Sequence, residues 1–276
     1  MSTRLAAVCL LALAAGCSAL GFAYNNADTS LRWQAARYLD PDSGQTRELD
    51  ARIDAFLAWH RAQALPQYAR LADEAVARLE RGISRADLVW GYDALRTQFR
   101  EGLRRAGADL GVLLDRVQPA QIEQLERRLA EDNRKFARDH LAGTPEERRS
   151  RRLKRTTRQL GDWLGELSDA QRERVRQFSE QAPLIGELRD RDRRRRQAEF
   201  VAMLRTRQSA QRLVDWAAEW DRDRDPAYAG ANHALVAEFF AMLVDLDRML
   251  SARQRQHAIA RLREYARDFE HLAAAR

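Results

Sequence analysis

From about residue 29 onward, apolar residues recur every three or four positions, and this period predicts amphipathic helices. The intervening positions are rich in Arg, Glu, Gln and Ala, which favour helix. No stretch alternates β-branched and polar residues as a strand would. We expect helices over residues 29–40, 43–63, 66–81, 85–106, 119–141, 145–166, 169–182, 184–220, 233–249 and 252–273. The pattern therefore predicts an all-α fold, drawn out as an elongated bundle of helical hairpins.

Proline residues and one long loop divide the predicted helices. Pro66, Pro119 and Pro145 fall where the first turn of a helix tolerates proline. The segment 221–230 (DRDRDPAYAG) is the clearest long loop. We therefore expect one helical domain over residues 29–276, with a candidate sub-boundary near residues 142–145.

A short motif, LSxxQ, recurs at the starts of predicted helices. Its copies contain Ser168 and Gln171, Ser251 and Gln254, and, in looser form, residues 117–121 (VQPAQ) and 41–45 (PDSGQ). A capping Ser and a Gln three residues later form a capping box, in which each side chain bonds to the other residue's backbone N–H. The spacing by itself therefore predicts helix caps, each contributing about 0.5–2 kcal/mol to stability.

The N-terminus has a different pattern: Arg4, an apolar stretch over residues 5–15, then Gly16 and Cys17. At ~1.5 Å per residue the stretch reaches about half of a ~30 Å hydrocarbon core, so it is too short to span a bilayer. It predicts a cleaved signal peptide, residues 1–16. Small residues directly before a cysteine resemble the lipobox of bacterial lipoproteins, which implies a lipid on Cys17. The alternative is an ordinary secretory signal that happens to end beside a cysteine.

Cysteine usage fits a lipid on Cys17. The chain has two cysteines, and Cys9 lies inside the predicted signal peptide, so Cys17 would have no partner in the mature chain. An odd exposed thiol is a liability in an oxidising compartment, and acylation would remove it. Ser18 follows, not the Asp that often retains lipoproteins at the inner membrane. We therefore expect the periplasmic face of the outer membrane, with the inner membrane less favoured, and a lipidated tether over residues 17–28 that can extend no more than about 35–40 Å.

Charge adds candidate partners. Charged residues make up 32% of the chain and the net charge is +7. In the periplasm the available anions are lipid headgroups, lipopolysaccharide phosphates and acidic proteins, and we expect no nucleic acid. Two runs concentrate the positive charge, residues 148–158 and 189–196. If the first run is helical, one face carries Arg148, Arg151, Arg152, Arg155 and Arg158. These are candidate contacts to an anionic surface; the alternative is a solvated face balanced by acids elsewhere.

The sequence contains no pattern typical of a catalytic, cofactor or metal site. Its histidines are scattered and make no HExxH pair, and no GxSxG, Walker or GxGxxG segment occurs. His60, between Trp59 and Arg61, is a candidate ligand-binding residue, with a packed or solvent-edge histidine as the alternative. We therefore expect a protein without cofactor or metal that is not an enzyme; an enzyme with an unrecognised site is a further alternative.

Two families resemble this sequence. The LSxxQ copies are similar to the LTxxQ motif of the periplasmic Spy and CpxP type chaperones, which are all-helical, cradle-shaped proteins that bind unfolded clients; here Ser replaces Thr. A closer overall resemblance is to an uncharacterised family of Gram-negative lipoproteins. Its segments match residues 24–28 (YNNAD), Trp33, residues 59–61 (WHR) and residues 65–69 (LPQYA). This second resemblance implies an address and a fold but no activity.

These patterns lead to one functional hypothesis and one alternative. We expect a membrane-anchored periplasmic lipoprotein that acts as a non-enzymatic binding or chaperone-like module, with an unfolded protein or another envelope protein as its client. The alternative is a structural envelope protein that contacts anionic lipids or an acidic partner through its Arg-rich helix faces.

Overall fold

The computed structural model describes residues 17–275, and for residues 17–19 it describes the backbone alone. The predicted signal peptide and the side chain of Cys17 lie outside the described residues. The cleavage and the lipid therefore remain predictions.

Residues 17–275 fold into helices joined by short turns. In chain order these are α2 (Cys17–Asn25), α3 (Ala27–Leu39), α4 (Ser43–Trp59), η2 (His60–Ala64), α5 (Leu65–Glu80), α6 (Arg85–Leu114), α7 (Pro119–Phe136), η3 (Ala137–Leu141), α8 (Pro145–Leu164), α9 (Asp169–Gln181), α10 (Gly186–Arg205), α11 (Ser209–Ala218), α12 (Pro226–Arg248) and α13 (Ala252–Ala274). The two η elements are π-helical turns. No strand occurs among these described residues, so the all-α prediction is confirmed.

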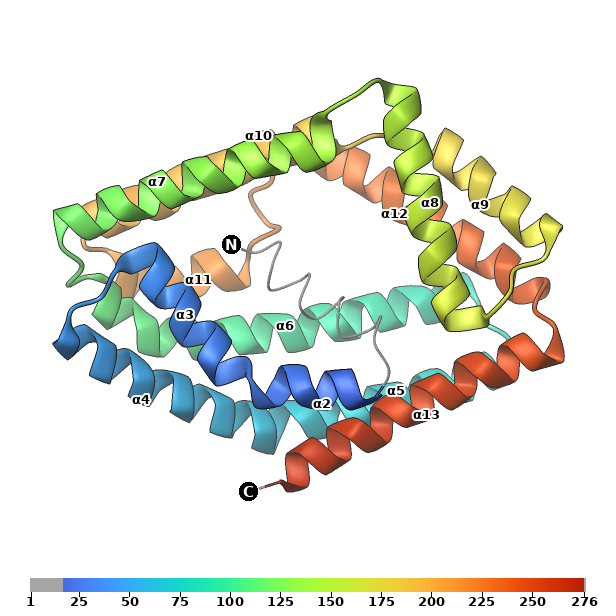
Figure 1. Ribbon diagram of the computed structural model, residues 1–276, viewed down its shortest axis with the longest axis horizontal. Coiled ribbons are helices and arrows are strands. Elements are labelled where there is room, and N and C mark those ends of the chain that lie inside the picture. Colours follow the sequence, from blue (N-terminus) through green and yellow to red (C-terminus); the bar gives the residue numbers. More distant parts are fainter. Residues whose placement is uncertain (1–16, 276) are drawn as a thin grey trace.

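The helices are arranged as an elongated, flattened frame (Figure 1). In this view α7 and α10 run along one long side, while α4, α5 and α13 follow the opposite side. Helix α6 runs lengthwise between them, and α8, α9 and α12 lie toward one end. At the other end lie α3, α11 and the start of α4. Segments far apart in the sequence therefore meet at each end.

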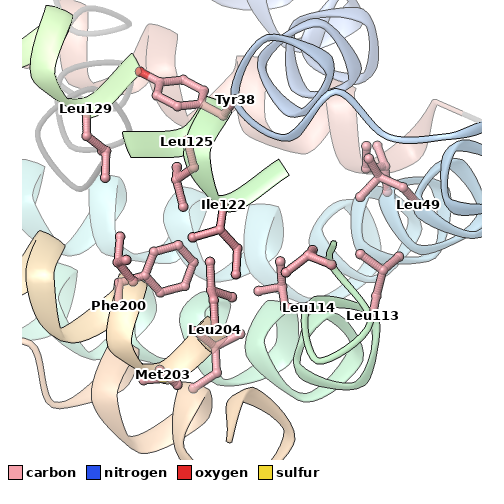
Figure 2. Close-up of a cluster of buried hydrophobic side chains, with 14 residues drawn as sticks. Tyr38, Leu49, Leu113, Leu114, Ile122, Leu125, Leu129, Phe200, Met203 and Leu204 are labelled. Carbon is pink, nitrogen blue, oxygen red and sulfur yellow. The ribbon is translucent and has the colours of Figure 1, made fainter. Parts of the chain in front are cut away.

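Within residues 17–275, the buried apolar residues form three separate clusters rather than one core. The largest packs α7 against α10 near the α6–α7 turn, where Leu125, Met203 and Leu204 are almost fully buried (Figure 2). A second cluster joins α9 and α12 around Val175 and Met242. The third, containing Leu20, Leu65, Tyr265 and Leu272, fixes α2 against α5 and α13. The first three quarters of α6 bury no residue completely, since its buried residues begin at Gly107.

Helices α6 and α11 approach each other backbone to backbone at two glycines. A Cβ on Gly111 would lie 2.8 Å from both the Ala210 Cα and the Ser209 carbonyl oxygen, and one on Gly107 would lie 3.2 Å from α11 backbone. Asp115, just after α6, accepts the N–H groups of Ser209 at 2.6 Å and Ala210 at 3.1 Å. Glycine is therefore needed for this approach, and Asp115 supplies the cap that starts α11.

Gly111→Ala is expected to lower the free energy of unfolding by about 1–3 kcal/mol, because backbone atoms cannot rotate away from the added methyl group. Gly102→Ala on the same helix is the matched control. Apart from its own helix backbone and its chain neighbours, no atom lies within 4 Å of its Cβ position. That change should raise stability by about 0.5–1 kcal/mol, since alanine loses less entropy on folding. Urea unfolding followed by circular dichroism measures both; effects of the same sign would contradict the close approach.

The single helix predicted over residues 184–220 is wrong. Helix α10 ends at Arg205 and α11 begins at Ser209. Between them Arg207 adopts a left-handed conformation, with φ +53°. The chain turns because α11 packs back along α6, a contact between distant segments that local periodicity does not encode.

Two further helix boundaries were predicted wrongly, because glycines and loop-favouring residues in the sequence suggested that the helix ended or had not begun. Helix α6 continues past residue 106 to Leu114, because Gly107 and Gly111 are held by α11. Helix α12 begins inside the predicted 221–230 loop, at Pro226, where the Asp225 carboxylate accepts the Tyr228 N–H at 2.9 Å. Proline at the first turn and a capping aspartate are helix-start signals that the loop prediction overlooked.

Most of the segment predicted as a tether, residues 17–28, is helical, although no helix was expected before residue 29. Residues Cys17–Asn25 form α2, and Leu20 is buried against α5 and α13. A nine-residue helix rises about 13 Å, far less than the extended reach. The body of the protein therefore begins beside Cys17.

Candidate functional site

The two LSxxQ copies meet at one end of the frame. The Gln171 amide donates to Gln254 Oε1 at 3.0 Å, and the Gln254 amide donates back to Gln171 Oε1 at 2.9 Å. Each amide also donates to a carbonyl oxygen in the turn before the other helix: Gln171 to that of Met249 at 3.2 Å, and Gln254 to that of Glu166 at 2.8 Å. We call such a pair of helix starts, joined through their glutamines, a corner. Gln171 is fully buried, so this reciprocal pair replaces solvent for the inner amide.

The same glutamines form the capping boxes. Gln171 Oε1 accepts the Ser168 N–H at 2.9 Å, and Ser168 Oγ accepts the Gln171 N–H at 3.2 Å. The equivalent distances for Ser251 and Gln254 are 3.1 and 3.2 Å. Each glutamine thus caps its own helix and binds the other one at once.

The looser copies form a second reciprocal pair at the opposite end of the frame. The Gln45 amide donates to Gln121 Oε1 at 3.2 Å, and the Gln121 amide donates to Gln45 Oε1 at 2.7 Å and to the Asp40 carbonyl at 3.1 Å. Asp40 stands five residues before Gln45, as Met249 does before Gln254. The two ends of the molecule are therefore built on one repeated corner, and the repeat in the sequence has a structural counterpart.

His60 is enclosed by aromatic rings where α2 meets the body. The Tyr24 hydroxyl lies 3.1 Å from His60 Nδ1, and the rings of Phe56 and Tyr68 have centroids 5.9 and 5.7 Å from it. Burial lowers the pKa of His60 to about 4, so the imidazole is neutral near pH 7. Arg61 lies over the Tyr24 ring at 5.5 Å. This geometry favours a packed histidine, and it brings together the three segments YNNAD, WHR and LPQYA.

Arg152 is not on a surface. It is 8% exposed, and its guanidinium donates to the carbonyl oxygens of Ser179 and Ala182 at 2.6 Å and of Pro183 at 3.0 Å. These carbonyls belong to the end of α9 and the residues after it, where helical acceptors lack partners. Arg152 is therefore a structural cap, and the expectation that it contacts an anionic surface is wrong.

The other four arginines of the run divide into two kinds. Arg148 pairs with Glu187 at the start of α10, and Arg151 donates to a carbonyl just before α8. Arg155 and Arg158 are exposed, and no ion pair to either occurs within residues 17–275. A shared contact by all five is therefore not supported, whereas Arg155 and Arg158 remain candidates.

No deep pocket stands out in the part of the chain that the structure describes. One hollow, of about 260 Å³, is lined by Arg100, Arg104, Glu219, Asp221 and Arg222. Another, of about 310 Å³, lies between α2 and α13 and is lined in part by Phe22, Asn25 and His271. No group of three or more His, Cys, Asp or Glu side chains in these residues is placed to hold a metal ion.

A family model links the fold to known sequences. The model of a family of unknown function, DUF6279, matches residues 37–222, more than half of the chain. The chain belongs to this family. The DUF6279 segment contains Gln45, Gln121 and Gln171 but ends before Gln254, and it begins after Cys17. No curated protein and no solved structure matches the chain.

Proposed function

We propose that this DUF6279 protein is a non-enzymatic binding module of the bacterial envelope, held at the periplasmic face of the outer membrane by a lipid on Cys17. Its client would be an unfolded protein or another envelope protein with apolar segments. The lipobox pattern supports the anchor, and the incompletely buried helix α12 supports the binding role.

Helix α12 is the observation that carries the binding role. It is the one described helix long and apolar enough to cross a membrane, yet only 11% of that apolar window is buried. A single such helix is weak evidence for a membrane span, and α12 contacts α9 through Phe239 and Phe178, whose ring centroids are 5.7 Å apart. An apolar helix with an exposed side is suited to covering apolar segments of a second protein.

The exposed part of α12 continues an apolar surface over the second core cluster. Phe239 is 37% exposed, and Leu235 and Leu243, one turn to either side, are partly buried against that cluster. Leu153 and Leu160 of α8 pack against the same cluster and are also only partly buried. We call these five residues the α12 patch. Its side chains are already ordered by the core beneath them, so binding a client loses little further entropy.

The α2–α3 segment supports placement at the membrane. One exposed side carries uncharged residues at helical spacing, Phe22, Asn26, Thr29, Trp33 and Ala36, with the Arg37 guanidinium over the Trp33 ring at 5.4 Å. The two aromatic residues are 73% and 58% exposed, in a chain where 32% of residues are charged. Exposed aromatic residues beside a lipid anchor suit the interface between headgroups and acyl chains. A second attachment would help to retain a singly anchored chain.

Suppression of client aggregation tests the binding role. The chain without residues 1–17 should suppress aggregation of a chemically unfolded test protein at equimolar amounts. Leu235→Gln with Phe239→Gln should require about tenfold more protein for the same effect, because burial of an apolar side chain is worth about 1.5–3 kcal/mol.

The matched control replaces two apolar residues that are more exposed but lie on α6, outside the α12 patch. Leu95 and Val112 are 56% and 52% exposed. Leu95→Gln with Val112→Gln should leave suppression unchanged. No suppression by the wild type would rule out the chaperone-like role, and an equal loss in the control would rule out the α12 patch.

A further inference from the structure

Two arginines of the second arginine-rich run, residues 189–196, lie over one aromatic ring, that of Phe136 at the end of α7. The Arg193 guanidinium lies over this ring at 4.4 Å and that of Arg189 at 5.8 Å, both from α10. The His140 ring, on η3, has its centroid 4.6 Å from that of Phe136. Gly186 packs closely against η3, because a Cβ there would lie 2.9 Å from Leu141. Arg189, Arg193 and His140 thus lie against the buried ring of Phe136.

Helix α8 brings the other run to the same place. The ion pair of Arg148 with Glu187 and the hydrogen bonds of Arg152 fix one side of α8 against the start of α10. Arg155 follows Arg152 by three residues and Arg148 by seven, so it stands on that side, one turn further along. Arg155 consequently faces the Arg189 side of α10.

Few carboxylates balance this group of cations. Asp190 pairs with Arg193 at 2.7 Å, and Asp139 pairs with Lys135 at 2.9 Å. Within the described residues, no carboxylate forms an ion pair with Arg155 or Arg189, whereas most arginines of the neighbouring helices have one. Arg224, which lies over the Trp220 ring at 4.3 Å and acts electrostatically on Arg189, also has no ion pair within residues 17–275.

The electrostatic environment agrees with this geometry. Burial lowers the pKa of Arg189; the neighbouring Tyr228 raises it, and the charges of Arg193, Arg155 and Arg224 lower it further. Burial likewise lowers the pKa of His140, and the charges of Arg189, Arg155 and Arg193 lower it further, while that of Asp139 raises it. Cations that are partly desolvated and repel one another are unfavourable unless an anion joins them. The folded protein therefore holds Arg189 partly buried and without a carboxylate partner, beside the exposed Arg155 and the paired Arg193.

We propose that Arg155, Arg189 and Arg193, with His140 at the edge, form a binding site for a phosphoryl group. The planar guanidinium fork matches phosphate oxygens in bidentate geometry. A phosphate monoester carries close to two negative charges at neutral pH, so it neutralises facing arginines better than a single carboxylate does. The phosphoryl group can come from a lipid headgroup or from a small soluble phosphate. This site is separate from the α12 patch, so either proposal can fail alone.

Thermal unfolding of the purified full chain in detergent tests the site. Sodium phosphate should raise the Tm relative to sodium chloride at equal ionic strength, and titration should saturate. Arg189→Gln should weaken the apparent phosphate affinity by about tenfold or more, since one charge-assisted contact is lost. Arg191→Gln is the matched control, because Arg191 lies on the same helix but is exposed; its phosphate response should equal that of the wild type.

Two outcomes would overturn the proposal. A wild type that responds equally to phosphate and chloride has no such site, and an Arg189→Gln variant that keeps the full response excludes Arg189. If Arg189→Gln does not fold, Arg155→Gln on α8 takes its place, with the same expected loss. The source is decided by titrating dihexanoyl phosphatidic acid beside inorganic phosphate: tighter binding of the lipid indicates a headgroup, and equal or weaker binding indicates a soluble phosphate.

Discussion

Cys17→Ser is expected to abolish incorporation of fatty acid into this protein. If Cys17 is the acylated residue, the thiol is the only acceptor, and serine cannot replace it in the lipid-transfer step. Each CH₂ group of an acyl chain buried in the bilayer contributes ~0.8 kcal/mol, so the loss removes the main attachment. The variant should persist as an uncut precursor or appear as a soluble product cut elsewhere.

Labelling cells with a clickable fatty acid, followed by gel mobility and membrane fractionation, measures this change. Cys9→Ser is the matched control, because Cys9 is the only other cysteine and lies within the predicted signal peptide. It should take up as much label as the wild type. The helical circular dichroism of the Cys17→Ser protein should be unchanged, since α2 is held by Leu20. An unlabelled wild type, or a labelled Cys17→Ser variant, would show that the lipoprotein assignment is incorrect.

Gln171→Leu is expected to lower the free energy of unfolding by about 3 kcal/mol or more. The side chain is fully buried and serves the Ser168 N–H, the Met249 carbonyl and the Gln254 amide. Leucine has a similar volume but satisfies none of these groups, and each buried polar group left without a partner costs about 1–3 kcal/mol. The loss should exceed that of an ordinary helix cap, at about 0.5–2 kcal/mol.

Gln177→Leu is the matched control, on the same helix. Gln177 is partly exposed and bonds only to Glu173, one turn earlier, so its effect should stay within about 0.5 kcal/mol. Adding Gln254→Leu to Gln171→Leu should cost less than the two single changes together, because the pair is then removed as a unit. Urea denaturation gives all four values. Strict additivity would contradict the reciprocal bond, and a loss no larger than that of Gln177→Leu would contradict the burial.

The helix starts were predictable because their cause is local. Ser168 with Gln171 and Ser251 with Gln254 act over three residues, and both boxes form as the sequence indicates. The same holds for the Pro119 and Pro145 starts. The spacing of the motif did not predict that the two glutamines bind each other, since Gln171 and Gln254 are 83 residues apart. Their mutual bond requires two corners to be brought together by the rest of the fold.

The arginine run illustrates the same limit within one helix. Helical periodicity places Arg148, Arg152 and Arg155 on one side of α8, but it does not say what covers that side. Arg152 is buried against the carbonyls at and after the end of α9, whereas Arg155 lies near Arg189 of α10, which pairs with no carboxylate within residues 17–275. Arg152 and Arg155 are the same residue type one turn apart, and residues distant in sequence give them different environments.

The sequence by itself determined the all-α class, most helix boundaries and the capping boxes, because these depend on interactions within one or two helical turns. Only the tertiary structure decided that the four glutamine motifs pair at two ends of a frame, that Gly107 and Gly111 continue α6 against α11, and that α2 packs on the body. Each of these depends on a surface supplied by another helix. Burial and close backbone approach are properties of two elements together, and no local pattern in one of them specifies the other.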